Sequence, residues 1–293
     1  MNKIRYLSLK QTEEIKHLAS EIRRSFGIVN DIPIANDIFM LLDKKGIILC
    51  QYPFKASEGS HTDATITWFE MENEPLTFIG LNTAIYYDEQ IFAVAHELYH
   101  YITKSGKAYD SDLEEEDQLT ERKADRFAAE LLLPHSALES LIVNEFDSKD
   151  LREVPIQRII RFLARLQCEW CLPYHSLVKR LLEEGYLEQE QYATLYQIDD
   201  RDKMGNYARI CNGIDSEKYQ LLNNKTNKKG ISGKVMEIMI QNYEDGYLTD
   251  DEFVNLLALF EKNPSDFGFD LSISNEDLDD LENLYGGGTP REG

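Results

Sequence analysis

The stretch that decides the fold reads His96-Glu97-Leu98-Tyr99-His100 and lies within a run of helical periodicity. Two histidines four residues apart on a helix project from the same face, so both imidazoles can reach one zinc ion at about 2.0 to 2.1 Å. Glu97 directly follows the first histidine, which places its carboxylate beside the metal rather than on it. There it can act as general base toward the attacking water. The stretch therefore predicts a helix with a metal site and Glu97 as catalytic residue.

The residues around this stretch predict a largely buried helix. An apolar stripe runs along it at helical spacing and consists of Ile91, Ala95, Leu98 and Ile102. Asp88 is placed as the N-cap, and the pattern continues to about Ser105. Two packing histidines without a metal would show the same spacing, so the motif needs support from further ligands.

A second helix offers that support. Residues 121–134 read Glu-Arg-Lys-Ala-Asp-Arg-Phe-Ala-Ala-Glu-Leu-Leu-Leu-Pro, and the proline closes the helix. A catalytic zinc site takes three protein ligands and keeps a fourth position open. Glu121 would complete a His, His, Glu set, and Asp125 could accept the free ring N–H of a ligand histidine. On spacing alone, the two acidic residues would fit a solvated edge equally well.

Together the two motifs resemble the ImmA/IrrE family of bacterial metallopeptidases. The resemblance rests on Phe92-Ala-Val-Ala-His96-Glu97-Leu-Tyr-His100-Tyr101 and on Glu121-x-x-Ala-Asp125-x-Phe127-Ala-Ala-Glu-Leu-Leu-Leu-Pro134. It is specific over residues 76–134, extends back to about residue 8 and is weak after residue 150. Glycine is common in the family at the position of Tyr99, a departure that touches no ligand.

The resemblance implies a gluzincin-type fold and one catalytic Zn²⁺ held by His96, His100 and Glu121. It also implies catalysis by Glu97, and protein substrates that are often helix-turn-helix repressors. A donor is needed for the charge that develops on the substrate carbonyl, and Tyr99, Tyr101 and His135 are unranked candidates.

The remaining sequence predicts an α+β fold. Helical patterns over Ser8–Phe26 and Pro33–Leu42 precede β-rich runs at Ile47–Tyr52, Thr65–Phe69 and Leu76–Leu81. We therefore expect a zincin-like peptidase core, in which a small mixed sheet joins the HExxH helix and the Glu-bearing helix, followed by an all-α C-terminal region. The strand that ends at Leu81 is expected at the sheet edge, where a substrate peptide could pair with it.

Shifts in composition along the chain predict its division into domains. The expected parts are a zincin-like metallopeptidase domain (1–150), a helix-turn-helix-like helical pair (151–198), a polar linker (199–230), an acidic helical hairpin region (231–285) and a flexible tail (286–293).

Composition also limits the function classes. The 293 residues are 42% hydrophobic and 29% charged, as in a soluble globular protein. The formal net charge is −22 and is concentrated in residues 108–150 and 231–293, so direct nucleic-acid binding is disfavoured. Met1–His17 lacks the apolar block of a secretory signal, and no run approaches the ~18 apolar residues of a membrane span. These features predict a cytoplasmic protein with no membrane association.

Three weaker signals have ordinary explanations that we favour. The pair Cys168 and Cys171 is expected to pack at a helix end rather than bind metal or do redox work. Residues 155–185 imitate a helix-turn-helix whose second helix bears Tyr174, His175, Ser176, Lys179 and Arg180. Because no section is strongly basic, an αα-hairpin packed on the peptidase, or a surface for a protein partner, is favoured over DNA binding.

Residues Asp245–Glu252 imitate half of a calcium-binding EF-hand loop. Tyr243 would occupy a position where calcium requires an oxygen-rich ligand, so an ordinary turn with Thr249 capping the next helix is favoured. A calcium site that involves Glu244 or Asp250 stays open as a hypothesis.

The sequence thus predicts a zinc-dependent endopeptidase that cleaves a regulatory protein such as a helix-turn-helix repressor. The alternative is a zincin-like module that binds a regulator or senses a ligand without cleaving anything. Glu97 separates the two, because a pure binder has no use for a carboxylate next to its first ligand.

Overall fold

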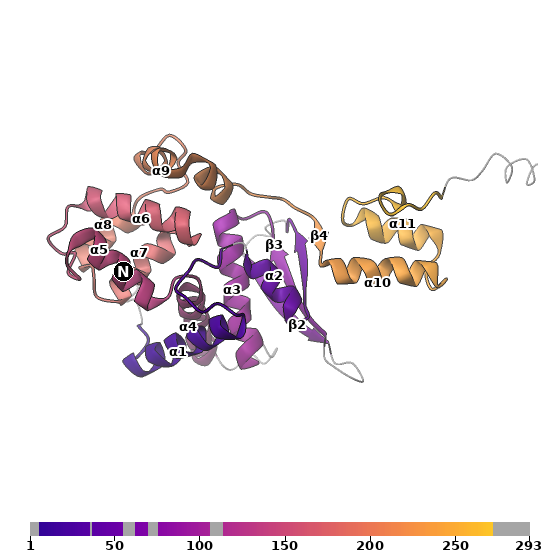
Figure 1. The fold of residues 1–293 in the computed structure, drawn as a ribbon, viewed down its shortest axis with the longest axis horizontal. Helices are drawn as coiled ribbons and strands as arrows, with labels where there is room; N and C mark the ends of the chain where they lie inside the picture. The colour runs from indigo at the N-terminus through magenta and orange to yellow at the C-terminus, as the bar shows by residue number, and fades with distance from the viewer. Residues whose placement is uncertain (1–5, 36, 55–61, 70–75, 106–113, 272–293) are drawn as a thin grey trace, which may run out of the picture. The chain divides into compact units, whose positions relative to one another are not determined.

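The computed structural model describes residues 6–35, 37–54, 62–69, 76–105 and 114–271, and the chain divides into two compact units, Met1–Ser232 and Gly233–Gly293 (Figure 1). The first unit contains the helices α1 (Leu9–Ser25), α2 (Asp37–Lys44), α3 (Tyr87–Thr103), α4 (Glu114–Leu132), α5 (His135–Phe146), α6 (Ile156–Trp170), α7 (Tyr174–Glu183), α8 (Gln189–Tyr196) and α9 (Asn206–Leu222). Its strands are β1 (Ile47–Tyr52), β2 (Ala64–Phe69), β3 (Leu76–Asn82) and β4 (Gly230–Ile231). No helix within the described ranges is both long and apolar enough to span a membrane.

The strands form one mixed sheet in the order β2-β3-β1-β4. Strand β1 runs parallel to β3, with Leu49 opposite Ile79, while β2 and β4 each join antiparallel. The expected mixed sheet is therefore confirmed, but the expected edge strand was wrong. β3 lies between two neighbours, and β2 is the edge next to it, because edge position depends on pairing partners that the alternation within β3 does not specify.

Helices cover this sheet in successive layers. Helix α3 packs on β2 and β3, α2 packs on β1 and α3, α4 packs on α3, and α1 packs on α4. The contact faces consist of small and branched side chains such as Ala95, Ala124 and Ala128, which are all nearly inaccessible. Small residues at these positions let the helix axes approach closely, so α3 and α4 lie side by side over part of their length. The predicted α+β core is thus present.

The start of α3 differs from the prediction. The N-cap is Tyr86, whose backbone N–H donates to Glu89, and not Asp88. Asp88 is fully buried and bonds to Gln167 at 2.9 Å and Arg201 at 2.9 Å. Burial raises the pKa of Asp88 to about 6, although Arg201 opposes this effect. Asp88 therefore ties α3 to the helical region rather than capping its first turn.

The region after α5 differs from the two parts expected there. Three helices, α6, α7 and α8, occupy the range 151–198 where a pair was expected. Residues 199–230 do not form a polar linker, since α9 packs on α6 and buries Tyr207, Ala208, Cys211, Tyr219 and Leu222. Beyond α9, β4 returns to the sheet edge beside β1, so this region is continuous with the peptidase core.

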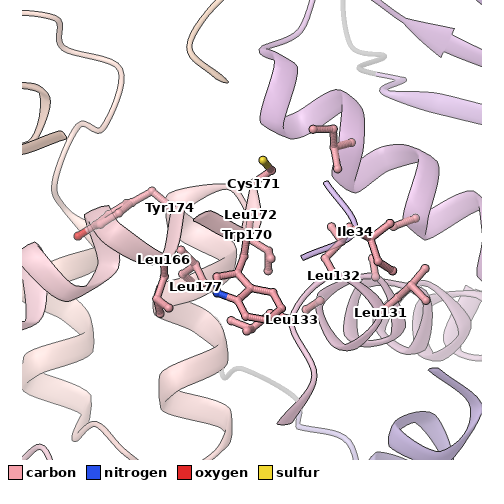
Figure 2. Packing of buried hydrophobic residues seen from close by; sticks show 14 of the residues in the cluster. Ile34, Leu131, Leu132, Leu133, Leu166, Trp170, Cys171, Leu172, Tyr174 and Leu177 are labelled. Carbon is pink, nitrogen blue, oxygen red and sulfur yellow. The ribbon is translucent and has the colours of Figure 1, made fainter. Parts of the chain in front are cut away.

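The helical region and the peptidase core share one apolar interior. Figure 2 labels Trp170, at the end of α6, and Leu133, which directly follows α4, and both belong to this interior. Cys168 and Cys171 are buried free cysteines at the same end of α6, as the packing interpretation expected. The extensive shared core fixes α7 against α4, which bears the acidic half of the predicted site.

A buried ionic network also joins α4 to α7. Arg180 on α7 bonds to Glu130 and to Glu184, and Arg126 on α4 bonds to Glu183 and to Glu184. The side chains of Arg180 and Glu130 are 1% and 5% exposed. The supposed recognition helix of a helix-turn-helix is thus packed on the peptidase, which is the arrangement that the αα-hairpin interpretation predicted.

This network predicts a specific loss of stability in acid. Burial opposes ionisation of Glu184, but Arg126 and Arg180 outweigh it and lower its pKa to about 2. Because the folded pKa lies below the unfolded one, this stabilisation is full above pH ~4.5 and is lost as pH falls toward ~2. The loss is on the order of 3 kcal/mol.

The measurement is the free energy of unfolding in urea between pH 4.5 and 2. Burial raises the pKa of Asp88 to about 6, so its titration lies above this window and does not obscure that of Glu184. Glu184→Gln should flatten the pH dependence relative to the unchanged chain. Equal slopes for the two proteins across this window would contradict the role given to Glu184.

The second unit is a small helical hairpin. It contains α10 (Gly233–Glu244), α11 (Asp250–Ala258) and the short 3-10 helix η1 (Pro264–Phe267), while residues 272–293, with the predicted tail, lie outside the described ranges. The rings of Tyr243 and Phe253 stack at 4.2 Å. Thr249 caps α11 as predicted, with Glu252 completing the capping box, and Asp250 accepts a hydrogen bond from Tyr243. The calcium hypothesis stays untested and predicts heat in a calorimetric calcium titration.

Candidate metal centre

Three side chains from α3 and α4 converge on one point. The Nε2 atoms of His96 and His100 lie 3.2 Å apart, and Glu121 places Oε2 3.1 Å from His96 Nε2 and Oε1 3.6 Å from His100 Nε2. These residues form a group that could hold a metal ion. The histidines are a turn apart on α3, and the α3–α4 contact brings Glu121 to them, as the sequence predicted.

The spacing fits a tetrahedral zinc ion. Ligands at about 2.0 to 2.1 Å from a tetrahedral metal lie about 3.3 Å from one another. The Nε2–Nε2 distance of 3.2 Å and the distance of 3.1 Å from His96 Nε2 to Glu121 Oε2 lie close to this value, and the other Glu121 oxygen lies 3.6 Å from His100 Nε2. Two imidazoles with one carboxylate are a usual donor set of catalytic zinc. The residues present therefore fit the metal that the sequence implied.

Each histidine is held by its other ring nitrogen. Nδ1 of His100 donates to the carbonyl oxygen of Ser105 at 2.6 Å, and Nδ1 of His96 donates to Asp125 Oδ1 at 3.1 Å. Since a carbonyl can only accept, His100 must carry its proton on Nδ1, which leaves the Nε2 lone pair directed at the metal position. Asp125 thus contacts a histidine of the group, as the sequence predicted, its role toward a bound metal stays a prediction, and Ser105 is an additional partner.

The surrounding carboxylates make this position favourable for a cation. Burial lowers the pKa of His96, but hydrogen bonds to Asp125 and Glu121 outweigh it and raise the pKa to about 9. Burial also opposes ionisation of Asp125, yet His96 and Lys179 keep its pKa below the usual value. Without a metal, a proton on His96 balances the negative charge of Asp125 and Glu121, and a bound metal ion would displace this proton.

Glu97 lines a cleft together with two members of the metal group, His96 and Glu121. The cleft has a volume of about 670 Å³, and its lining includes His96, Glu97, Glu121 and Asp125. Glu97 itself is 8% exposed. Glu97 is not one of the three converging side chains, and its role as general base stays a prediction of the motif.

The three donor candidates from the sequence lie elsewhere. Tyr99 is buried, with its ring 5.6 Å from that of Phe127 on α4, so it packs the α3–α4 contact. Tyr101 lies under Lys104, whose Nζ is 4.4 Å from the ring centroid. His135 lines a separate cavity and places Nδ1 3.2 Å from Glu184. None of the three is among the residues that line the metal cleft, and their role as donors is untested.

The opposite wall of the cleft comes from the helical region, which the sequence did not assign to the site. Its residues are Pro173, His175, Ser176, Asp199, Asp200 and Arg201. His175 Nδ1 lies 3.4 Å from Asp200 Oδ1, and Nε2 lies 3.2 Å from the carbonyl oxygen of Tyr196. The sequence signal was the spacing of His175 and Lys179, which places both on one face of α7.

Lys179 connects this wall to the metal ligands. Its Nζ lies 3.3 Å from Asp125 Oδ2, while Oδ1 of the same carboxylate bonds to His96 at 3.1 Å. Lys179 therefore fixes the orientation of the group that orients a ligand. We therefore expect Lys179 to affect metal affinity through Asp125, without contacting the metal itself.

We predict that Lys179→Met weakens zinc binding about tenfold, because outer partners of ligands contribute about 10- to 100-fold to metal affinity. Competition with a chromophoric chelator measures the change at constant pH. Lys10→Met is the matched control, since Lys10 is 89% exposed on α1 and should leave the affinity unchanged. Equal affinities for the Lys179 variant and the unchanged chain would show that Asp125 is held without it.

The chain was compared with models of protein families. Residues 42–182 match the model of the IrrE N-terminal-like domain, a family of peptidases. The matched range begins in α2, contains the complete His96, His100 and Glu121 group, and ends in α7. No curated protein matches the chain.

Proposed function

Because residues 42–182 belong to the family of the IrrE N-terminal-like domain, we propose that the chain is a zinc-dependent endopeptidase that cleaves a regulatory protein. The observation that carries the proposal is the convergence of His96, His100 and Glu121 at 3.1 to 3.6 Å, with Glu97 in the same cleft. A bound zinc ion would supply Lewis-acid chemistry to the substrate carbonyl and to water.

The chain's own residues account for the remaining parts of the reaction. Glu97 takes a proton from the attacking water and can pass it to the leaving amine, as a nearly buried carboxylate beside the ligands is suited to do. Asp125 and Ser105 hold the ligand histidines in one tautomer. Preorganised ligands lower the cost of reaching the reactive geometry.

The substrate backbone has a place to bind along the sheet. β2 is one of the two edge strands, and its first residue, Ala64, lines the metal cleft together with the preceding Thr62 and Asp63. An extended peptide that adds to this edge by main-chain hydrogen bonds would bring a carbonyl toward the metal group. Such binding requires an extended segment, so an exposed loop or a locally unfolded helix of a target protein is the expected cleavage site.

We propose a helix-turn-helix transcriptional repressor as the target, as the family resemblance implies. The test is co-expression with the product of the neighbouring gene and with candidate helix-turn-helix repressors, followed by mass spectrometry of any fragment. The purified pair should yield the same fragment. 1,10-Phenanthroline should abolish the cleavage, and added zinc should restore it. An intact repressor with the zinc-loaded protein would reject this target, and cleavage that survives metal removal would reject the mechanism.

A further inference from the structure

The end of α3 holds a small hydrogen-bond network beside one member of the metal group. The network consists of the hydroxyl groups of Thr103 and Ser105, the carbonyl oxygens of Tyr99 and Ser105, and the imidazole of His100. Thr103 is the last residue of α3, and it lies outside both halves of the metal motif. The proposed mechanism uses only one of these groups, the carbonyl of Ser105.

The backbone after α3 turns back toward His100 at Lys104. Lys104 is the C-cap of the helix and has left-handed backbone angles, φ 54° and ψ 26°. The next residue, Ser105, places its carbonyl oxygen 2.6 Å and its hydroxyl oxygen 3.2 Å from Nδ1 of His100. The orientation of the imidazole therefore depends on how Ser105 is held.

The direction of each hydrogen bond follows from a count of the hydrogens. Thr103 has one hydroxyl hydrogen, and the carbonyl of Tyr99, 2.8 Å away, can only accept it. The contact of 2.5 Å between Thr103 Oγ1 and Ser105 Oγ therefore uses the hydrogen of Ser105. Once this hydrogen is donated, Ser105 Oγ offers only lone pairs to His100.

The same count determines the tautomer of His100. Its Nδ1 faces two acceptors, the carbonyl and the hydroxyl oxygen of Ser105, so Nδ1 must carry a proton. In the neutral ring the lone pair is then on Nε2, the nitrogen that points toward His96 and Glu121. The network at the end of α3 thus prepares His100 to bind a metal through Nε2.

We propose that Thr103 is a positioning residue for His100 and acts through the hydroxyl of Ser105. The inference rests on the proposed function, because His100 is a ligand of the proposed zinc ion. By accepting from Ser105, Thr103 keeps the serine hydrogen away from His100. Without this acceptor the hydroxyl can rotate and donate to Nδ1, which favours the tautomer with its proton on Nε2 and competes with metal binding.

The test compares the zinc affinities of full-length variants by competition with a chromophoric chelator at constant pH. Thr103→Val keeps the branched shape of the side chain and removes the hydroxyl. We expect zinc binding to weaken about fivefold, somewhat less than the ~10- to 100-fold of groups that contact a ligand directly. Thr103→Ser keeps a hydroxyl and should bind zinc as tightly as the unchanged chain.

Two further variants separate this role from a general effect of losing a helical threonine. Thr194→Val is the matched control, because Thr194 is exposed on α8 and donates to the carbonyl of Glu190 at 2.9 Å, as Thr103 does to Tyr99. It should leave the affinity unchanged. Adding Thr103→Val to Ser105→Ala should cause no further loss, since the hydroxyl through which Thr103 acts is already absent.

The imidazole proton gives a readout that altered stability alone would not change. Nuclear magnetic resonance of zinc-loaded protein with ¹⁵N-labelled histidine follows the exchange of the Nδ1 proton of His100 with water. This exchange should be slow in the unchanged chain, because two acceptors hold the proton. Thr103→Val should accelerate it several-fold, whereas Thr103→Ser should not.

The outcomes separate this inference from the proposed function. Equal zinc affinity of Thr103→Val and the unchanged chain overturns the inference, and so does an equal loss in Thr103→Ser or in Thr194→Val. A full additional loss in the double variant also overturns it. In each of these cases zinc still binds, so the proposed function stands. An unchanged chain that binds no zinc would reject both, and the expected affinities without hydrolysis of any substrate would reject the peptidase alone.

Discussion

Glu97→Gln is expected to lower the rate of substrate cleavage about 10³-fold while the zinc content stays the same, because a positioned general base typically contributes about 10²- to 10⁴-fold. Glutamine has the same shape as glutamate but cannot take up the proton of the attacking water. The metal should stay bound because Glu97 is not one of the three converging ligands, and the fold should persist because the substitution conserves volume in a nearly buried site.

The measurement is a single-turnover cleavage assay together with metal analysis of the same sample. Glu169→Gln is the control, since Glu169 is an exposed residue of α6 and should cleave at the unchanged rate. The variant also separates the two functions considered from the sequence. Full relief of repression in cells by a zinc-loaded Glu97→Gln protein would exclude proteolysis and favour a module that acts by binding alone.

Local signals in the sequence were sufficient for the elements that carry the metal ligands. Strand β1 has the predicted bounds, Ile47–Tyr52, because Gly46 and Pro53 flank a short β-branched run. Helices α3 and α4 followed from apolar stripes at helical spacing, and the candidate ligands followed from residue types beside those stripes. Both kinds of signal involve residues within a few turns of one another, so no knowledge of long-range pairing was required.

Contacts between segments that are far apart in the sequence could not be predicted from such local signals. Strand β4 comprises only Gly230–Ile231, too short to give a β pattern, yet it closes one side of the sheet. Residues 199–230 read as polar because α9 buries tyrosines among many charged neighbours. Tyr207 donates to Gln167 and Tyr219 donates to the carbonyl of Asp200, so their hydroxyl groups are satisfied inside the core.

The opposite wall of the cleft could not be predicted from the sequence for the same reason. The spacing of His175 and Lys179 predicts that they share one face of α7. The neighbouring sequence does not predict which residues contact that face. Lys179 meets Asp125 of α4, and His175 meets Asp200, which is 25 residues further along the chain. Sequence alone therefore gives the three residues of the candidate metal group, whereas the groups that contact Asp125 and line the other side of the cleft depend on how α7 docks.

That docking should depend strongly on Arg180, and we expect Arg180→Met to destabilise the first unit by about 3 to 5 kcal/mol. The guanidinium is 1% exposed and lies between the carboxylates of Glu130 and Glu184. Without it, the buried Glu130 keeps only Arg126 as a cation partner among the described residues, and their closest contact is 3.5 Å. An unpaired buried charge costs far more than the net gain of the original pair.

The free energy of unfolding can be followed in urea by tryptophan fluorescence, because both tryptophans, Trp68 and Trp170, lie in the first unit. Arg161→Met, at an exposed position of α6, should change stability by less than about 0.5 kcal/mol. Adding Glu130→Gln to Arg180→Met should restore part of the loss, since the amide keeps the hydrogen bond from His135 N–H and removes the buried charge. A loss below about 1 kcal/mol for Arg180→Met would mean that apolar packing alone holds α7 on α4.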